Sequence, residues 1–393
     1  MTATHTTTNS ERTSWSCRRK WFFRHLLRLR PILTARPLRV GGLWHHAMEA
    51  LYGVPGQGVD LDRAKKAIVE QTTANIAMLR GDTSFDPSSD YRLTPEDVQQ
   101  DAALVGAMLA GYWEKWQTEL AGTVVLLNEE ALYRNTVTPQ GTISPVSLFG
   151  GKVDKVIRDS HGQNWLVEHK SSKVALDAWR PRNDYKPQAP TYAWLLQNHP
   201  ALEGRDVVGV LYDLALTRVP PKPEDLTVLK KGDRLSKVLP SGTTLQVFEA
   251  ALRMHGFALT DEEWYQERAI ELGALEDPFF RRELYRFAEG EAEVGRELWT
   301  IATDIRRAHH DAEDVVAKLD ASRNTVGWKE EVVEIVKVND YRFPRSPDSC
   351  WAFNRPCDYM ALCRYRDCGS LVDLEVVDEI NPELDLTVNH DKE

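Results

Sequence analysis

The spacing of hydrophobic residues changes from helical to strand-like and back along the chain. A helical period predicts helices over four early segments, which are 13–31, about 41–52, 60–80 and 95–119. Runs rich in β-branched residues then predict strands over 123–128 and 141–148 and a hairpin over 151–170. A helix over 188–197 and a strand over 206–213 complete this part. The succession predicts an α/β fold, with a small mixed sheet flanked by helices.

The second half of the chain follows a different pattern. It predicts a mainly helical insertion or subdomain over 217–345, with helices at 243–256, 261–270 and about 277–311 and one strand near 331–337. We expect the other parts to be a disordered tail (1–12), a core that begins with a basic helix (13–216), a cysteine-rich region (346–370) and an acidic, solvated tail (371–393).

The hairpin places two carboxylates opposite each other across a turn rich in Asp, Ser, Gly and Asn. Folding that is symmetric about this turn pairs Arg158 with Asn164. Asp154 then faces Glu168, and the alternation of side chains puts Lys170 on their face of the strands. Opposed carboxylates repel each other unless a cation, here a metal ion or Lys170, lies between them. A solvated polar face on an edge hairpin would show the same pattern, so these residues alone leave the function open.

Composition and the absence of long apolar segments indicate where in the cell the protein is expected. With 42% hydrophobic and 27% charged residues, the sequence is typical of a globular protein. No apolar run approaches the length of a membrane span, and the Thr-rich start, Met1–Ser10, lacks the apolar core of a signal peptide. We therefore expect a cytoplasmic protein that has no membrane partner.

A basic stretch stands out against the net charge of −10. Nine Lys or Arg residues and no Asp or Glu lie between Arg12 and His46. Such a stretch either forms an electrostatic footprint for nucleic acid or packs against an acidic neighbour. The chain has no G-x-x-x-x-G-K-[ST] motif, so it lacks a P-loop nucleotide site.

Four of the five cysteines cluster near the end of the chain. Cys350, Cys357, Cys363 and Cys368 fall within 19 residues, whereas Cys17 is alone near the start. An odd count without a secretion signal argues against a disulfide framework, and the dense cluster favours a metal centre. Iron–sulfur clusters and structural zinc both take four thiolates, and the four clustered cysteines could form a local site.

Several motifs occur in one order along the chain. They are Gly41-x-x-x-His45 at the start of a helix, Gly151-x-x-Asp154 and Glu168-x-Lys170 on strands, Gln188-x-x-x-Tyr192 on a following helix, and the flanking cysteines. Together they resemble the PD-(D/E)XK nuclease superfamily, in its RecB-like branch, which includes the CRISPR-associated exonucleases. The resemblance extends over about 10–216 and 346–368. It implies a restriction-endonuclease-like core and a metal-dependent DNA nuclease.

The resemblance implies a role for each residue at the metal site. Asp154 and Glu168 would be the principal ligands of Mg²⁺ or Mn²⁺, hard ions that prefer oxygen and keep several waters. The backbone carbonyl of His169 and the side chain of His45 would add ligands. Lys170 would position or help deprotonate the attacking water and offset developing negative charge, or else merely neutralise Glu168.

The choice of histidine depends on spacing. The Gly-x-x-x-His spacing from Gly41 favours His45, whereas the same spacing from Gly42 would select His46. Either histidine could instead lie on the helix surface or in the core, without a ligand role.

Further side chains could line the site. Gln188 and Tyr192 lie one helical turn apart and, by resemblance, face the active site or contact DNA. Pro190 between them is tolerated only in the first turn, which places the helix start close to Gln188. Tyr192 could equally pack in the core. Glu129 or Glu130, just after the first predicted strand, could add a carboxylate.

For the cysteines the resemblance implies a [4Fe–4S] cluster, and structural Zn²⁺ is the alternative. The cluster ligands would be Cys17, Cys350, Cys357 and Cys363. Such a cluster would pin the two ends of the chain together, so that 346–370 packs back on the N-terminus.

The resemblance also implies a substrate and partners. It points to an exonuclease that acts on single-stranded DNA or DNA ends in recombination, repair or phage DNA processing, and that binds DNA through the stretch Arg12–Arg39. A helicase or recombination protein could be a partner, and any motor must be another chain because this one lacks a P-loop. The alternatives are a non-catalytic DNA-binding or assembly protein on a nuclease fold and the nuclease subunit of a helicase–nuclease complex.

Overall fold

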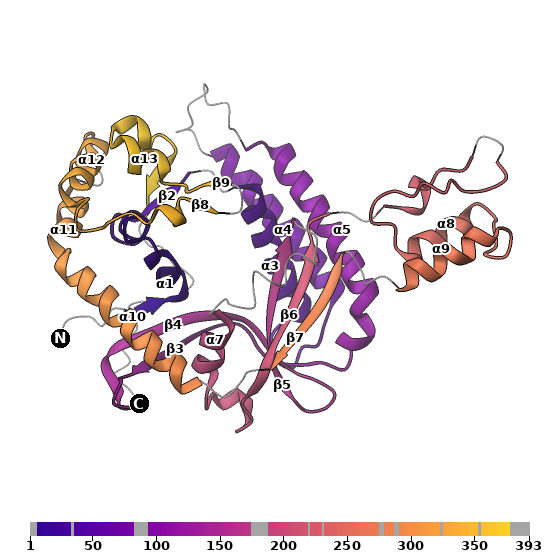
Figure 1. The fold of residues 1–393 in the computed structure, drawn as a ribbon, viewed down its shortest axis with the longest axis horizontal. Coiled ribbons are helices and arrows are strands. Elements are labelled where there is room, and N and C mark those ends of the chain that lie inside the picture. The colour runs from indigo at the N-terminus through magenta and orange to yellow at the C-terminus, as the bar shows by residue number, and fades with distance from the viewer. Residues whose placement is uncertain are drawn as a thin grey trace.

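The computed structural model describes residues 6–32, 35–81, 93–173, 188–218, 221–229, 232–274, 279–286, 291–322, 325–352 and 355–377. Figure 1 shows a central sheet, a lobe built from both ends of the chain and a helical module that projects to one side. Within the described residues, no helix combines the length and the apolar character needed to cross a lipid bilayer.

A six-stranded mixed sheet forms the centre of the fold. Its strands are β1 (Thr6–Thr8), β3 (Val124–Val137), β4 (Ile143–Arg158), β5 (Asn164–Ser172), β6 (Val207–Leu216) and β7 (Phe280–Arg286). The order is β1-β4-β5-β6-β7, and β3 pairs with the other edge of β4. β1 is parallel to β4 and β5 is parallel to β6, whereas the β3–β4, β4–β5 and β6–β7 pairs are antiparallel.

Two strands share one edge of β4 and leave a gap between them. β1 pairs with residues 148–150 of β4, and β5 pairs with residues 155–158. Residues 151–154 have no strand partner on that edge among the described residues. Asp154 therefore lies in a part of β4 where no neighbouring strand pairs with this edge among the described residues.

Three helices cover one face of the sheet. They are α3 (Arg36–Tyr52), α4 (Leu61–Gly81) and α5 (Pro95–Leu120). Their apolar sides share a core with alternate strand residues such as Ile157, Val167 and Leu211. α5 begins as its sequence predicts, because Thr94 and Asp97 form a reciprocal capping box.

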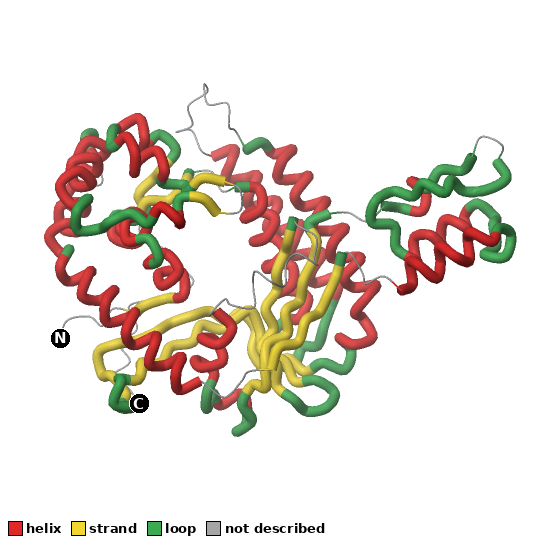
Figure 2. Tube along the Cα trace, viewed as in Figure 1, coloured by secondary structure: helices red, strands yellow, loops and turns green. Residues whose placement is uncertain are grey.

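The other face carries α7 (Gln188–Leu196), the 3-10 turn η3 (Pro200–Leu202) and α10 (Glu291–Asp311) (Figure 2). Tyr192 and Leu195 of α7 and Leu298 of α10 pack there with Val156 and Leu166. The sheet is therefore buried on both faces, which confirms the predicted mixed sheet flanked by helices.

Both ends of the chain fold into one lobe. The N-terminal part contributes α1 (Asn9–Trp15), α2 (Arg18–Trp21), the π-helix η1 (Phe22–Leu26) and β2 (Leu29–Pro31). The C-terminal part contributes α11 (Glu313–Ser322), α12 (Trp328–Asn339), η5 (Pro347–Ser349), β8 (Trp351–Ala352), β9 (Arg355–Pro356), α13 (Met360–Tyr365), η6 (Cys368–Leu371) and β10 (Leu374–Val376). β10 pairs with β2, and the two parts share one hydrophobic core.

A small module lies between β6 and β7. It contains the 3-10 turn η4 (Pro223–Asp225), α8 (Leu245–Met254) and α9 (Glu263–Ala274). Phe248, Trp264 and Tyr265 form the centre of its own hydrophobic core. Figure 1 shows the module projecting away from the sheet.

The N-terminal segment differs from its prediction. A disordered tail over 1–12 is wrong from Thr6 onward, because β1 pairs with β4 and Thr8 caps α1. The single basic helix expected over 13–31 is broken at Cys17, which has an extended backbone, and continues as α2 and η1. Residues 1–5 lie outside the described part of the chain.

The insertion is smaller than its predicted span of 217–345. Residues 280–286, expected within a long helix, form β7, in which Phe280 and Arg282 face inward and the charge of Arg282 is matched by Asp213 on β6. The strand expected over 331–337 is part of α12, where a β-branched run buries one helical side. The segment 141–148 does not form a separate strand, because it is continuous with the first arm of the hairpin as β4.

The C-terminal tail also differs in part. Residues 374–376 of the expected solvated tail form β10 and pair with β2, since Leu374 is buried in the core of the lobe. Residues 378–393 lie outside the described part of the chain.

Candidate active site and cysteine cavity

The gap beside β4 brings the hairpin carboxylates to one place. The β4–β5 ladder pairs Arg158 with Asn164, as predicted, and its last pair comes one residue before Asp154 and Glu168. Oδ2 of Asp154 accepts a hydrogen bond of 2.9 Å from the backbone N–H of His169. The strands therefore separate where the two carboxylates lie.

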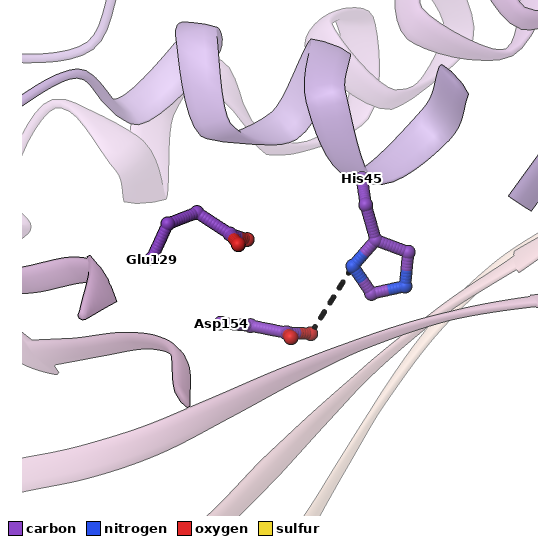
Figure 3. Close-up of side chains that lie close together, drawn as sticks. All are labelled: His45, Glu129 and Asp154. Atoms are coloured by element: carbon purple, nitrogen blue, oxygen red, sulfur yellow. Dashed lines mark ion pairs between the residues drawn. The ribbon is translucent and has the colours of Figure 1, made fainter. Parts of the chain in front are cut away.

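His45 and Glu129 form a group of metal-type donors with Asp154 (Figure 3). His45 reaches down from α3, and its Nδ1 lies 3.4 Å from Oδ2 of Asp154. Glu129 comes opposite Asp154 across the β3–β4 ladder, because Asn128 and Glu130 pair with the residues on either side of Asp154. One donor atom from each of the three side chains lies within 4.8 Å of the others.

Glu168 is buried beside this group. Its Oε1 accepts hydrogen bonds from Lys170 Nζ and, at 2.8 Å, from Gln188 Nε2. Gln188 Nε2 also lies 3.4 Å from the hydroxyl of Tyr192. Oε2 of Glu168 is buried and has no hydrogen-bond partner among the described residues. A buried carboxylate oxygen without a partner is unfavourable, so it offers a coordination position to a cation.

A close approach between α7 and β4 holds the site together. A Cβ atom at Gly151 would lie 2.7 Å from Cε1 of Tyr192, so only glycine allows the ring to pack here. Pro190 lies in the first turn of α7, where its missing N–H is tolerated. This packing places Gln188, the first residue of α7, over Glu168.

Burial sets the charge states of the site. Burial raises the pKa of Asp154, although the positive charge of Lys170 opposes the rise. Burial also raises the pKa of Glu168, and the negative charge of Asp154 adds to that rise. Desolvation lowers the pKa of His45 to about 4, so the imidazole is neutral at pH 7 and has a lone pair available. Burial opposes the charge of Lys170, but Glu168 and Asp154 outweigh it and raise the pKa of the amine. A divalent cation would relieve the carboxylate repulsion.

The structure separates the residues that the sequence left as alternatives. His46 lies toward the outside of α3, with its Nδ1 3.6 Å from Oε2 of Glu49, whereas His45 faces Asp154. The side chain of His169 lies on the other face of the sheet, so its backbone carbonyl stays a predicted ligand.

Glu129, and not Glu130, belongs to the donor group. Its φ of 53° is in the left-handed region, and its Oε2 lies 2.7 Å from Lys152 Nζ. The pairing register of β3 with β4 selects Glu129 over Glu130, and this register could be determined only from the structure.

Replacing His45 with alanine is expected to weaken Mn²⁺ binding and to slow any cleavage that depends on it, because it would remove one of the three metal-type donors. The loss should reach at least the roughly 10- to 100-fold seen when residues around a metal ligand are changed. Isothermal titration with Mn²⁺ and initial rates measure the two effects. The neighbouring His46→Ala is the matched control and should keep both values, and equal losses in the two variants would contradict the placement of His45.

The basic stretch Arg12–Arg39 is partly engaged within the protein. Arg19 is buried and donates hydrogen bonds to backbone carbonyl groups of the C-terminal part of the lobe. Arg36 and Arg39 both contact Asp101, with N–O distances of 2.7 and 2.9 Å. These three residues therefore follow the interpretation in which the basic stretch packs within the protein, against backbone acceptors and an acidic neighbour.

Four cysteines line one cavity in the lobe formed by the chain ends. Its volume is about 300 Å³, and its lining includes Cys17, Cys350, Cys357 and Cys363. Four cationic side chains line it as well, those of Arg19, Lys20, Arg345 and Arg364. Cys368 is not part of this lining. A cavity with four thiols and several cations suits an anionic metal–thiolate centre.

Comparison with known proteins agrees with this geometry. No curated protein matches the sequence. A family model of the PD-(D/E)XK nuclease superfamily matches residues 11–364, a span that contains the donor group, the hairpin, α7 and the cavity-lining cysteines. The chain therefore belongs to the PD-(D/E)XK nuclease superfamily.

Proposed function

We propose that this chain is a metal-dependent deoxyribonuclease of the RecB-like branch, an exonuclease that hydrolyses phosphodiester bonds at single-stranded DNA ends. The observation that carries the proposal is the convergence of the His45, Glu129 and Asp154 donors beside Glu168 and Lys170 at the open edge of β4. This set combines ligands for a divalent ion with a cation close to them, as phosphodiester hydrolysis requires.

Asp154, Glu168 and Glu129 would hold Mg²⁺ or Mn²⁺, with His45 and the backbone carbonyl of His169 as further ligands. The buried Oε2 of Glu168 supports this set because it otherwise lacks a partner among the described residues. When bound, the ion supplies an activated water and charge stabilisation at the phosphate.

The remaining side chains act on the water and on the ligands. Lys170, kept cationic by Glu168, orients the attacking water and offsets the negative charge that develops on the phosphate. Gln188 holds Oε1 of Glu168, which would leave Oε2 available to the ion. Tyr192 fixes the Gln188 amide through a 3.4 Å contact.

Surface chemistry beside the cysteine cavity supports a single-stranded substrate. The side chain of Trp351 is 63% exposed, and Trp351, Arg345 and Arg364 all line the cavity. An exposed aromatic ring stacks on an unpaired base, and nearby arginines bind backbone phosphates. We propose that DNA contacts this rim and the stretch Arg12–Arg39, in which Arg12, Arg19, Arg28, Arg36 and Arg39 also make contacts within the protein. A helicase or recombination protein would supply the strand.

We further propose that the cavity holds a [4Fe–4S] cluster. A tetrahedral zinc ion with 2.3 Å bonds would need its four sulfurs about 3.8 Å apart. In the described chain, no three cysteine sulfurs lie within 4.8 Å of one another. Wider spacing suits a cluster with one thiolate on each of four irons.

A cleavage assay with and without metal tests the nuclease proposal. We expect Mg²⁺ or Mn²⁺ to allow degradation of end-labelled linear single-stranded DNA, and excess EDTA to abolish it, because the proposed reaction takes its activated water and its charge stabilisation from the ion. Circular single-stranded DNA is the control for the end requirement and should resist. Cleavage of circles would show endonuclease action, and binding of DNA without cleavage under either metal would favour a non-catalytic protein.

A further inference from the structure

A row of buried polar side chains crosses the sheet behind the carboxylate site. Lys155 on β4, His169 on β5 and Asp213 on β6 are each at most 2% exposed. Arg282 on β7 extends the row, because it pairs with Asp213 in the β6–β7 ladder. The row faces α3 and α5, so it lies on the opposite side of the strands from Glu168.

The row runs from β4 to β7 through one hydrogen bond and two longer polar contacts. Lys155 Nζ lies 2.8 Å from Nε2 of His169, and His169 Nδ1 lies 3.4 Å from Oδ2 of Asp213. Arg282 Nε lies 3.6 Å from the other oxygen of Asp213. Two tyrosines from the covering helices close the row. Tyr112 donates a hydrogen bond to Asp213, and the ring of Tyr52 lies 3.8 Å from Lys155 Nζ.

The charge states agree with this arrangement. Burial opposes the charge of Asp213, but Arg282 and His169 outweigh it and hold the pKa of the carboxyl at about 2. Burial and the charge of Lys155 lower the pKa of His169 to about 3, so the imidazole is neutral. Its Nε2 then accepts a hydrogen bond from the Lys155 ammonium, which leaves the proton on Nδ1, toward Asp213.

Stability alone does not explain such a row. Taking charged groups out of water is costly, and well-packed apolar side chains of similar volume are often as stable or more so. The same face already uses Val167, Leu211 and Ala215 for packing around the row. A polar row in this position therefore points to a requirement for one fixed geometry.

The row acts on the carboxylate site through His169. The backbone N–H of His169 binds Asp154, and its two chain neighbours are Glu168 and Lys170. We propose that Lys155, Asp213 and Arg282 are positioning residues that lock the His169 side chain, and so fix the backbone that orients Asp154, Glu168 and Lys170. This inference rests on the proposed metal site. At the end of the row farthest from Lys155, Arg282 lies on β7, the strand that follows the helical module.

The experiment compares Asp213→Asn and Arg282→Met with Arg158→Met. Arg158 is a matched control, because it lies on the same sheet, is 18% exposed against 14% for Arg282, and pairs with Glu203 at 2.9 Å away from the site. Mn²⁺ affinity without DNA, kcat and KM are measured on each folded variant. We expect the two row variants to lose about 10- to 100-fold in Mn²⁺ affinity and kcat with an unchanged KM for DNA, as for other residues that hold metal ligands in place. Arg282→Lys should recover most of both losses.

Three outcomes would overturn the positioning role. They are Mn²⁺ affinity and kcat equal to those of Arg158→Met, no recovery by Arg282→Lys, and failure of both row variants to fold while Arg158→Met folds. The metal-site proposal fails separately, if the wild-type protein binds no Mn²⁺. If the wild type binds Mn²⁺ but cleaves no DNA, the nuclease proposal fails, and the Mn²⁺ affinities still test the row.

Discussion

Replacing Asp154 with asparagine is expected to reduce kcat roughly a thousand-fold, because losing several kcal/mol of metal-based transition-state stabilisation corresponds to that factor. The same change should stabilise the metal-free protein. Asparagine can still accept the hydrogen bond from the His169 N–H, and it removes a buried charge that Glu129 and Glu168 repel. Cleavage rates and thermal unfolding without metal measure the two effects.

The difference in stability between Asp154→Asn and the wild type should change with pH in a direction that can be measured. The folded pKa of Asp154 is raised, so the folded protein binds more protons than the unfolded one over the window above the ordinary value of about 3.9. Stability of the metal-free wild type therefore falls as pH rises through that window, whereas Asp154→Asn lacks this loss. The Tm advantage of the variant should be small in acid, grow toward neutral pH and then level off.

A divalent metal ion should make the wild type more stable than Asp154→Asn, the reverse of the order expected without metal. Mg²⁺ or Mn²⁺ is expected to raise the Tm of the wild type by mass action and to have little effect on Asp154→Asn. Asp159→Asn is a useful control, because Asp159 is a half-buried residue at the turn of the same hairpin and its pKa is lowered rather than raised. A metal-free wild type that is more stable than Asp154→Asn at pH 7 would contradict the electrostatic account of the site.

Replacing Cys17 with serine is expected to remove the brown colour and visible absorbance that the proposed [4Fe–4S] cluster would give to anaerobically purified protein, and to destabilise the lobe formed by the chain ends. The cluster would join Cys17 to residues 350–363, so its loss removes a cross-link across almost the whole chain. Cys350, Cys357 and Cys363 should behave in the same way. Iron and sulfide analysis, absorbance and unfolding of the purified variants measure these losses.

Cys368→Ser is the matched control for the cysteine series. Cys368 lies in the same lobe but outside the cavity lining, so its replacement should leave colour and iron content intact. Colourless wild-type protein with one equivalent of zinc would refute the iron–sulfur proposal and leave the proposed nuclease site untouched. Loss of iron in Cys368→Ser would instead point to a local site of the four C-terminal cysteines.

Local signals in the sequence were sufficient for much of the fold. The capping box at Thr94 sets the start of α5, and the turn after Arg158 sets the hairpin register. Both features depend on residues a few positions apart. The candidate motif residues could be named before the structure because each motif spans a single strand or helical turn and resembles a motif of the PD-(D/E)XK superfamily.

The missed features depend on partners far away in the sequence. β7 lacks a clear strand pattern in the sequence because one of its inward side chains is Arg282, which is buried beside Asp213 of β6. The choice of Glu129 over Glu130 depends on a left-handed residue and on the β3–β4 register. The polar row behind the site was missed for the same reason, since its members come from four strands that no local pattern connects.

The order of the strands along the chain has a consequence for biosynthesis. A ribosome releases a protein from its N-terminus, and folding follows that order. Glu168 and Lys170 emerge well before Arg282, which follows the whole helical module, and Cys17 must wait for residues 350–363. A nascent or prematurely ended chain thus carries the candidate metal ligands without the last strand of its sheet and without three of the four cavity cysteines. The last strand of the sheet and three of the cavity cysteines are thus made after the hairpin, so the proposed nuclease and its proposed cluster can be complete only after residue 363 has emerged.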